Sequence, residues 1–305
     1  AYEGIRNRFG DKNVCVYNGC DTKKAVETAG NAEYIVVCVG SDWLQEGEFL
    51  VNLGNIKKKP KGSGGDRADL RIPSEDVEMI KALSKTGKKL IVNIMGGSAY
   101  VIKEWTDLAD AILFSFYSGL EGGNALADIL SGDVNPGGKL PFTIAYNDTD
   151  YPEFLHIADK KLEIDYGYYH GYTLFDKKGI EAHYPFGFGL SYTDFEICDC
   201  SAEKDDKNIT VTATVKNIGD VCGDEVVQVY ISSENKTEDR PVKLLKGFRR
   251  VTVDADKEVM AEIIIPIDEI KFYDPEKGIW KTDEAYCVLI GTSSKNAKRI
   301  GKINF

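Results

Sequence analysis

The spacing of hydrophobic residues changes near residue 195, and this change is the feature that most restricts how the chain folds. Before it, short apolar runs alternate with stretches of helical period. After it, apolar and polar residues alternate along successive short segments. Strands buried on both faces read as continuous apolar runs, whereas strands with one solvated face show a period of two. The sequence therefore predicts two domains of different class, at 1–194 and 195–305.

The first domain is predicted to be an α/β sandwich with a largely parallel sheet. Strand-like apolar runs and helix-period stretches alternate at 33–40, 73–87, 88–97, 101–110, 111–119 and 124–132. Because the apolar runs lack polar alternation, helices are expected to cover both faces of the sheet.

The second domain is predicted to be an all-β sandwich. Period-two segments occur at 208–217, 224–233, 243–253, 258–267 and 285–294. Turn residues separate them and no helical stretch intervenes, which is typical of an immunoglobulin or fibronectin type III sandwich.

The net charge of -11 argues against a nucleic-acid partner, because the only strongly basic run is the short KKKPK at 57–61. No apolar run approaches the roughly 18 residues that a membrane-spanning helix needs, so no membrane partner is expected. The N-terminal AYEGIRNRFG does not resemble a signal peptide. Whether the chain forms a homo-oligomer is left open.

The seven cysteines are odd in number and show no CxxC spacing, so we expect reduced thiols and a cytoplasmic location. His156, His170 and His183 lack the spacing of metal ligands. We expect neither a metal nor a cofactor.

The stretch VVCVGSDWLQEGEF, residues 36–49, places acidic residues directly after a strand. Ligands of open parallel sheets bind beyond the carboxyl ends of the strands. A carboxyl group from Asp42, Glu46 or Glu48 can act there as a general acid or base if burial raises its pKa toward neutrality. For each residue taken alone, a solvated loop charge is the plainer interpretation.

Longer motifs in a fixed order resemble the C-terminal half of the family 3 glycoside hydrolases, the β-glucosidases and their relatives. They are YSGLEGGNALADILSGDVNPGGKLPFTI, GYTLFDKKGIEAHYPFGFGLSYTDFE, VVQVYIS with RPVKLLKGFRRV, and IKFYDPEKGIW with YCVLIGTSS. The resemblance covers nearly the whole chain.

The resemblance implies an α/β sandwich followed by a fibronectin type III-like domain, both normally attached to a (β/α)8 barrel. It implies hydrolysis of β-glycosides from the non-reducing end with retention. The aspartate nucleophile comes from the barrel, and a glutamate of the sandwich domain is the acid/base. That glutamate lies in an EG pair after a VVVG-like strand, which identifies Glu46 in QEG as the predicted acid/base, with Glu48 as the second choice.

Four further residues are candidates for substrate binding. Trp43 and Phe49 are placed to stack on a sugar, although packing is the commoner role of such aromatics. Asp66 and Arg67, in GGDR, are expected to pair and brace the loop or to contact substrate. Asp42 lies in an SDW triplet like that of the barrel nucleophile, but the strand before it and the GGDR after it place it in the sandwich domain.

No segment here matches a (β/α)8 barrel, so a barrel domain or chain carrying the nucleophile is the expected partner, and a β-linked oligosaccharide or glycoside the expected substrate. β-Xylosidase specificity is an alternative. Another is a non-catalytic carbohydrate-binding or scaffold module. A nucleotide-binding doubly wound domain is the weakest alternative, because no GxGxxG follows the first strand.

Overall fold

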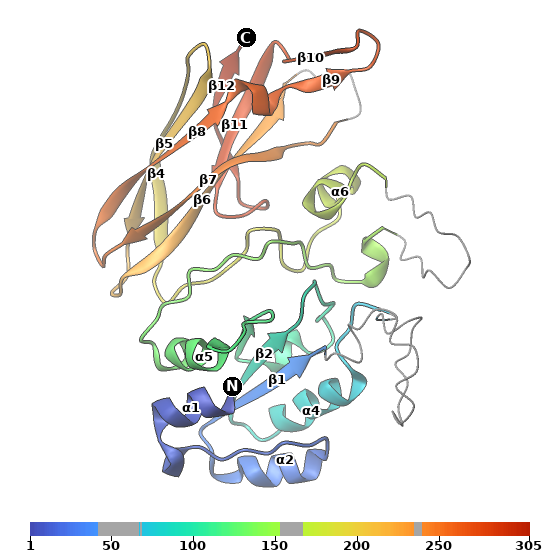
Figure 1. Cartoon of the computed structure of the whole chain (residues 1–305), viewed down its shortest axis with the longest axis vertical. Helices are drawn as coiled ribbons and strands as arrows, with labels where there is room; N and C mark the ends of the chain where they lie inside the picture. Colours follow the sequence, from blue (N-terminus) through green and yellow to red (C-terminus); the bar gives the residue numbers. More distant parts are fainter. Residues whose placement is uncertain (42–66, 68, 153–166, 235–239) are drawn as a thin grey trace, which may run out of the picture. The chain divides into compact units, whose positions relative to one another are not determined.

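A computed structural model describes residues 1–41, 67, 69–152, 167–234 and 240–305 of the chain (Figure 1). Two compact units emerge. The first contains 1–134 and 144–166, and the second contains 135–143 and 167–305. The second unit thus takes in connecting segments that precede the β-sandwich, and the domain boundary after residue 194 stays a prediction.

The first unit has an α/β architecture. Its elements are α1 (Tyr2–Phe9), η1 (Asp11–Asn13), α2 (Thr22–Thr28), η2 (Ala29–Asn31), β1 (Tyr34–Gly40), α4 (Ser74–Ser84), β2 (Lys89–Met95), η3 (Thr106–Leu108), β3 (Ala111–Phe114), α5 (Gly122–Ser131) and η4 (Asp148–Asp150). The strands form a parallel sheet in the order β1-β2-β3, as predicted.

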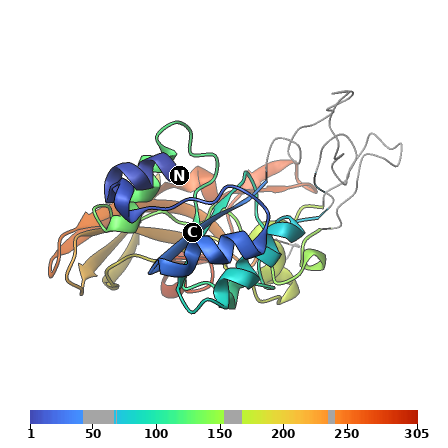
Figure 2. The same cartoon turned by 90° about the horizontal axis from the view of Figure 1, so that it is seen from below.

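Helices flank this sheet in pairs. Figure 2 shows α1 beside α5 and α2 beside α4, with the sheet between the two pairs. Val92 and Ile94 of β2 and Ile80 of α4 are completely buried, which explains the apolar runs in the sequence. Among the described residues, no helix is long and apolar enough to cross a membrane.

The helical prediction for 101–110 is wrong. This stretch forms turns and the short 3₁₀ segment η3. Its apolar residues are nevertheless buried: Ile102 and Trp105 are each 1% exposed. The apolar spacing therefore reflects a turn packed against the core, and a period of this length does not distinguish the two cases.

The second unit is dominated by a β-sandwich. Its elements are α6 (Gly171–Lys178), β4 (Phe195–Lys204), β5 (Asn208–Asn217), β6 (Gly223–Ser233), β7 (Leu244–Val253), β8 (Glu258–Pro266), η6 (Ile267–Ile270), β9 (Phe272–Asp274), β10 (Ile279–Lys281), β11 (Ala285–Gly291) and β12 (Lys298–Asn304). The two main sheets are antiparallel, in the orders β12-β11-β6-β7 and β4-β5-β8.

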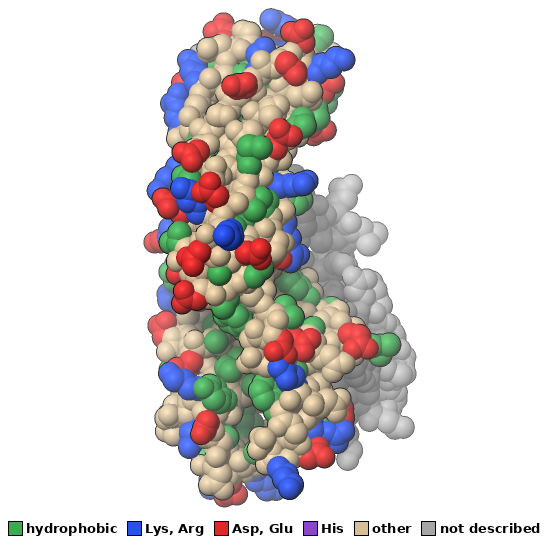
Figure 3. Space-filling model, turned by 90° about the vertical axis from the view of Figure 1, so that its left-hand side faces the viewer, with side chains coloured by type: hydrophobic (Ala, Val, Ile, Leu, Met, Phe, Trp, Pro, Cys, Tyr) green, Lys and Arg blue, Asp and Glu red, His purple; other side chains and the backbone are tan. Residues whose placement is uncertain are grey.

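Alternating burial along the strands builds the sandwich core. Ile209, Val211, Ala213 and Val215 of β5 point inward, and the residues between them are only partly buried. On the face of the second unit drawn in Figure 3, acidic and basic side chains are intermixed. The all-β prediction is confirmed, and the five predicted segments match β5, β6, β7, β8 and β11 closely.

A buried amide ties the strands of the sandwich together. Asn217 is 2% exposed, and its Oδ1 accepts from Thr193 Oγ1 at 2.5 Å and from the Gly219 amide at 3.1 Å. Its Nδ2 donates to the carbonyls of Val221 and Val253, at 2.8 and 2.9 Å. The side chain therefore uses all of its donors and acceptors inside the unit.

Substitution of Asn217 tests this network. We expect Asn217→Ala to lower the free energy of unfolding by about 2–4 kcal/mol, because buried hydrogen-bonding groups lose their partners. Urea denaturation measures the change. Lys207→Ala, at an exposed turn position, serves as the control and should change stability by less than about 0.5 kcal/mol. Equal stability of the two variants would contradict a structural role for the Asn217 network.

Candidate functional site

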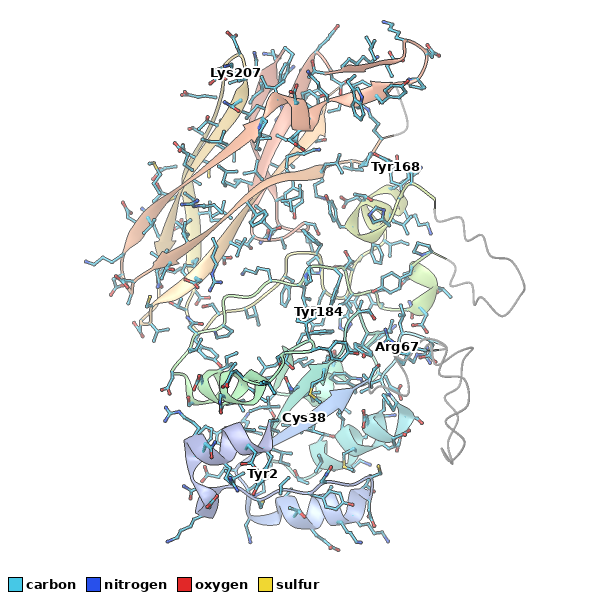
Figure 4. All side chains as sticks on the ribbon, viewed as in Figure 1. Tyr2, Cys38, Arg67, Tyr168, Tyr184 and Lys207 are labelled. Atoms are coloured by element: carbon cyan, nitrogen blue, oxygen red, sulfur yellow. The ribbon has the colours of Figure 1, made fainter. Side chains whose placement is uncertain are left out.

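The carboxyl ends of three parallel strands define the candidate site in the first unit. β1 ends at Gly40, β2 at Met95 and β3 at Phe114. Because the strands are parallel, these ends lie along one edge of the sheet, where α/β sheets bind ligands. Figure 4 shows Arg67 near the end toward which β1 and β2 run, and Cys38 within β1.

Gly40 determines how the chain leaves β1. Its φ of 135° lies in a region that favours glycine, and a Cβ at this position would collide with the carbonyl oxygen of Met95. The next amide, that of Ser41, donates to the same carbonyl at 3.1 Å. The Gly40 amide donates to Asp76 Oδ2 at 3.3 Å. The exit from β1 is thereby held by both β2 and α4.

Tyr100 holds both flanks of residues 42–66. Its side chain is fully buried, and its hydroxyl shares a 2.6 Å hydrogen bond with Ser41 Oγ. The guanidinium carbon of Arg67 lies 4.5 Å from the centre of the Tyr100 ring, and Nη2 of Arg67 donates to Ser98 Oγ. A cation over an aromatic face contributes between about 0.5 and 2 kcal/mol. Both flanks of this segment therefore converge on one buried ring.

An aromatic cluster with a strained backbone adjoins this ring. The ring centres of Tyr100 and Phe114 are 6.1 Å apart, and those of Phe114 and Phe116 are 4.8 Å apart. Phe116 has a φ of 52°, which is uncommon for a bulky residue. Such strain costs on the order of 1–3 kcal/mol and concentrates at functional sites. It lies just beyond the carboxyl end of β3.

The sheet itself offers no activated nucleophile at Cys38. Cys38 is exposed on the sheet, yet partial desolvation by the surrounding chain raises the pKa of its thiol, and a 3.8 Å hydrogen bond from Asn93 Nδ2 only partly opposes this. The thiol is therefore neutral near pH 7 and a weak nucleophile. All seven cysteines are free. In the described part of the chain, no cluster of three or more His, Cys, Asp or Glu residues is arranged to hold a metal ion.

The predicted site residues divide into two groups. Arg67 lies at the carboxyl edge, in contact with Tyr100 and Ser98. The others lie outside the described residues and stay predictions: Asp42, Trp43, Glu46, Glu48, Phe49 and Asp66. The role of Arg67 in binding substrate is likewise still a prediction.

Sequence reasoning missed Ser41, Ser98, Tyr100 and Phe116. The one usable signal was the Gly96-Gly97 pair after β2, since a Cβ at Gly96 would collide with the Tyr100 hydroxyl. Paired glycines after a strand indicate a close approach of another group to the backbone. They do not say which group approaches.

Comparison with known proteins extends these observations. Residues 1–192 match the glycosyl hydrolase family 3 C-terminal domain, and residues 225–294 match a fibronectin type III-like domain. The chain is 32% identical over 313 residues to thermostable β-glucosidase B of Acetivibrio thermocellus, covering 97% of this chain and 39% of that protein. It is 34% identical over 286 residues to a xylan 1,4-β-xylosidase of Xylanibacter ruminicola, covering 92% and 31%.

Solved structures show the same fold. A β-D-glucoside glucohydrolase of Trichoderma reesei aligns with a TM-score of 0.87 at 24% identity, over 99% of this chain and 44% of that one. A β-glucosidase of Bifidobacterium adolescentis aligns with a TM-score of 0.82 at 29% identity, with the same coverage. The chain thus spans less than half the length of these relatives.

The exit from β1 yields a test of this site. Gly40→Ala should lower the free energy of unfolding by about 2 kcal/mol or more, because alanine disfavours this φ and its Cβ meets Met95. Gly30→Ala is the matched control. A Cβ there meets no atom within 4 Å, and the change should be neutral or slightly stabilising. Equal urea midpoints for the two variants would show that Gly40 does not fix the exit from β1.

Proposed function

Since the chain belongs to glycosyl hydrolase family 3, we propose that it is the part of a retaining, exo-acting β-glycosidase that supplies the general acid/base. β-Glucosides are the proposed substrates. The observation that carries this proposal is the 97% coverage of this chain by a relative named as a β-glucosidase. The nucleophile is proposed to come from a (β/α)8 barrel outside these 305 residues.

Glu46 is the proposed proton donor. Retaining hydrolysis needs two carboxyl groups about 5–5.5 Å apart, one to attack the anomeric carbon and one to protonate the leaving oxygen. The five steps along the backbone from Ser41 to Glu46 span at most about 18 Å, so the attachment of Ser41 to Tyr100 keeps Glu46 within reach of the carboxyl edge of the sheet.

The contacts of Tyr100 with Ser41 and Arg67 support this assignment, because a catalytic acid/base must be held in position relative to the bond that it protonates. Displacing a catalytic group by about 1 Å can cost on the order of a hundredfold in rate. Gly40, Ser41 and Arg67 are the anchored points on either side of residues 42–66. We infer that Arg67 braces this segment, and that Trp43 and Phe49 stack on the leaving-group sugar, with Asp66 alongside.

β-Xylosidase specificity is the second candidate, favoured by the 34% identity to a xylan 1,4-β-xylosidase. Comparing kcat/KM of the whole enzyme for aryl β-glucosides and aryl β-xylosides separates the two. A non-catalytic scaffold role is the third, and variants of Glu46 would then leave hydrolysis unchanged. The seven free thiols support a cytoplasmic location as part of the proposal.

A leaving-group series tests the role of Glu46. In the whole enzyme, Glu46→Ala should slow hydrolysis of glucosides with poor leaving groups by about 10²–10⁴-fold, since these need protonation. Activated aryl glucosides should be far less affected, and azide should restore their turnover.

Glu48→Ala is the control for this series and should resemble the wild-type enzyme. If Glu48→Ala shows the leaving-group dependence instead, the acid/base is Glu48. If Glu46→Ala matches the wild type on both substrate classes, the assignment to Glu46 is wrong.

A second test concerns the division of labour. The purified 305-residue chain should not turn over aryl β-glucosides, because it has an acid/base without the proposed nucleophile. Adding the barrel domain should bring activity. Sustained turnover by the 305-residue chain alone, in a preparation free of contaminating glycosidase, would refute a nucleophile located elsewhere.

A further inference from the structure

Two exposed aromatic rings lie side by side on the β9–β10 hairpin, which extends from one corner of the sandwich (Figure 1). Tyr273 and Trp280 are direct cross-strand partners, so their side chains share one face of the hairpin. Their ring centres are 5.7 Å apart at an interplanar angle of 60°. Tyr273 is 51% exposed and Trp280 is 66% exposed. The pair presents an open, bent aromatic surface.

The opposite face anchors the hairpin to the sandwich. The Phe272 ring lies under the Arg240 guanidinium, with 3.8 Å from its centre to Cζ. Arg240 in turn donates to Asp283 Oδ2 at 2.6 Å. Asp274, 5% exposed, forms a 2.8 Å ion pair with Lys281. The face of the hairpin opposite the aromatic pair is therefore fixed to the sandwich.

The turn between the two strands is also held in place. Asp274 Oδ1 accepts hydrogen bonds from the amides of Glu276 and Lys277, at 3.0 and 3.2 Å. Gly278, with a φ of 64°, supplies the left-handed residue that completes the turn. A surface that is rigid before binding loses little conformational entropy on binding a ligand.

Hairpin stability alone does not account for this exposure. A cross-strand aromatic pair stabilises a hairpin by about 0.2–1 kcal/mol, and the exposed fractions of Tyr273 and Trp280 leave much of each ring open to solvent. A stable protein interface requires about 800 Å² on each partner. The exposed apolar side chains of this hairpin are Tyr273, Ile279 and Trp280, too few for such an area.

Sugar rings match this surface better. A β-linked pyranose has axial C–H groups that form apolar faces, and aromatic faces carry the negative quadrupole that attracts such C–H groups. Glu276 and Lys277, in the turn that joins the two strands, carry charged side chains of the kind that hydrogen-bond to sugar hydroxyls. Because the rings are inclined by 60°, the surface suits a curved chain more than a flat, crystalline one.

We propose that Tyr273 and Trp280 form a binding site for soluble β-linked glycan chains. The choice of glycan as the ligand class rests on the proposed function. The observed geometry of Tyr273 and Trp280 does not depend on which residue is the acid/base. Such a site would hold the enzyme on a polymeric substrate between cleavage events.

Titration of the 305-residue chain with laminarin, a soluble β-1,3-glucan, tests the proposal by calorimetry. We expect binding to laminarin and none to dextran, an α-linked glucan. Trp280→Ala should weaken binding about tenfold or more, and Tyr273→Ala by a smaller factor. Trp280→Phe, which keeps an aromatic face, should retain most of the affinity.

Ile279→Ala is the matched control, because Ile279 is an exposed apolar neighbour on the opposite face of the hairpin. Its affinity should equal that of the wild type. Tryptophan emission gives a second readout, because Trp105 is buried and Trp280 is exposed among the described tryptophans.

The outcomes separate this proposal from the proposed function. Glu46→Ala should abolish general acid catalysis in the whole enzyme without changing laminarin binding. The site is refuted if laminarin does not bind, or if binding is unchanged in both Trp280→Ala and Tyr273→Ala. It is also refuted if these variants alter the oligomeric state instead of sugar affinity, since the rings would then form a protein interface.

Discussion

The contacts of the buried Tyr100 side chain are the constraint on which the rest of the candidate site depends. The Tyr100 hydroxyl forms a hydrogen bond with Ser41, and the face of the Tyr100 ring contacts the Arg67 guanidinium. The neighbouring Ser98 accepts a hydrogen bond from the same guanidinium. Each contact is modest alone. Together they bring Ser41 and Arg67, which are distant in the sequence, to the carboxyl edge of β1 and β2. At the same edge, the backbone at Gly40 packs closely against the carbonyl group of Met95.

This arrangement accounts for a division between scaffold and chemistry. The strands and α4 bury their apolar residues and hold the strand ends rigidly, while the residues proposed to act on substrate follow those ends. The sandwich of the second unit stands on its own core and its own buried polar network around Asn217. It provides a separate folded support, from which the β9–β10 hairpin presents Tyr273 and Trp280.

Much of the fold could be predicted because burial leaves a direct trace in the sequence. The alternation in 208–217 coincides with β5, and the continuous apolar run before Gly40 coincides with β1. The same reasoning failed at 101–110, where Ile102 and Trp105 pack inward from turns. β9 and β10 are only three residues long, which is too short for a period in the hydrophobic pattern to be recognised.

Only those residues of the candidate site that belong to local sequence motifs could be predicted. GGDR led to Arg67 as a candidate, and the family resemblance led to Glu46; the functional roles of both residues stay predictions. The role of Tyr100 was not accessible, because the pairing of β1 with β2 brings Ser41 to it across 59 residues, and Arg67 reaches it from a position outside the sheet.

The pH dependence of kcat/KM in the whole enzyme tests the central claim most directly: that this chain lends a proton donor at position 46 to a cleft completed elsewhere. With an aryl β-glucoside whose leaving group needs protonation, the wild-type profile should fall at alkaline pH as the donor ionises. In Glu46→Gln this alkaline limb should vanish, because the donor no longer titrates. An alkaline limb that persists unchanged in Glu46→Gln would contradict the claim.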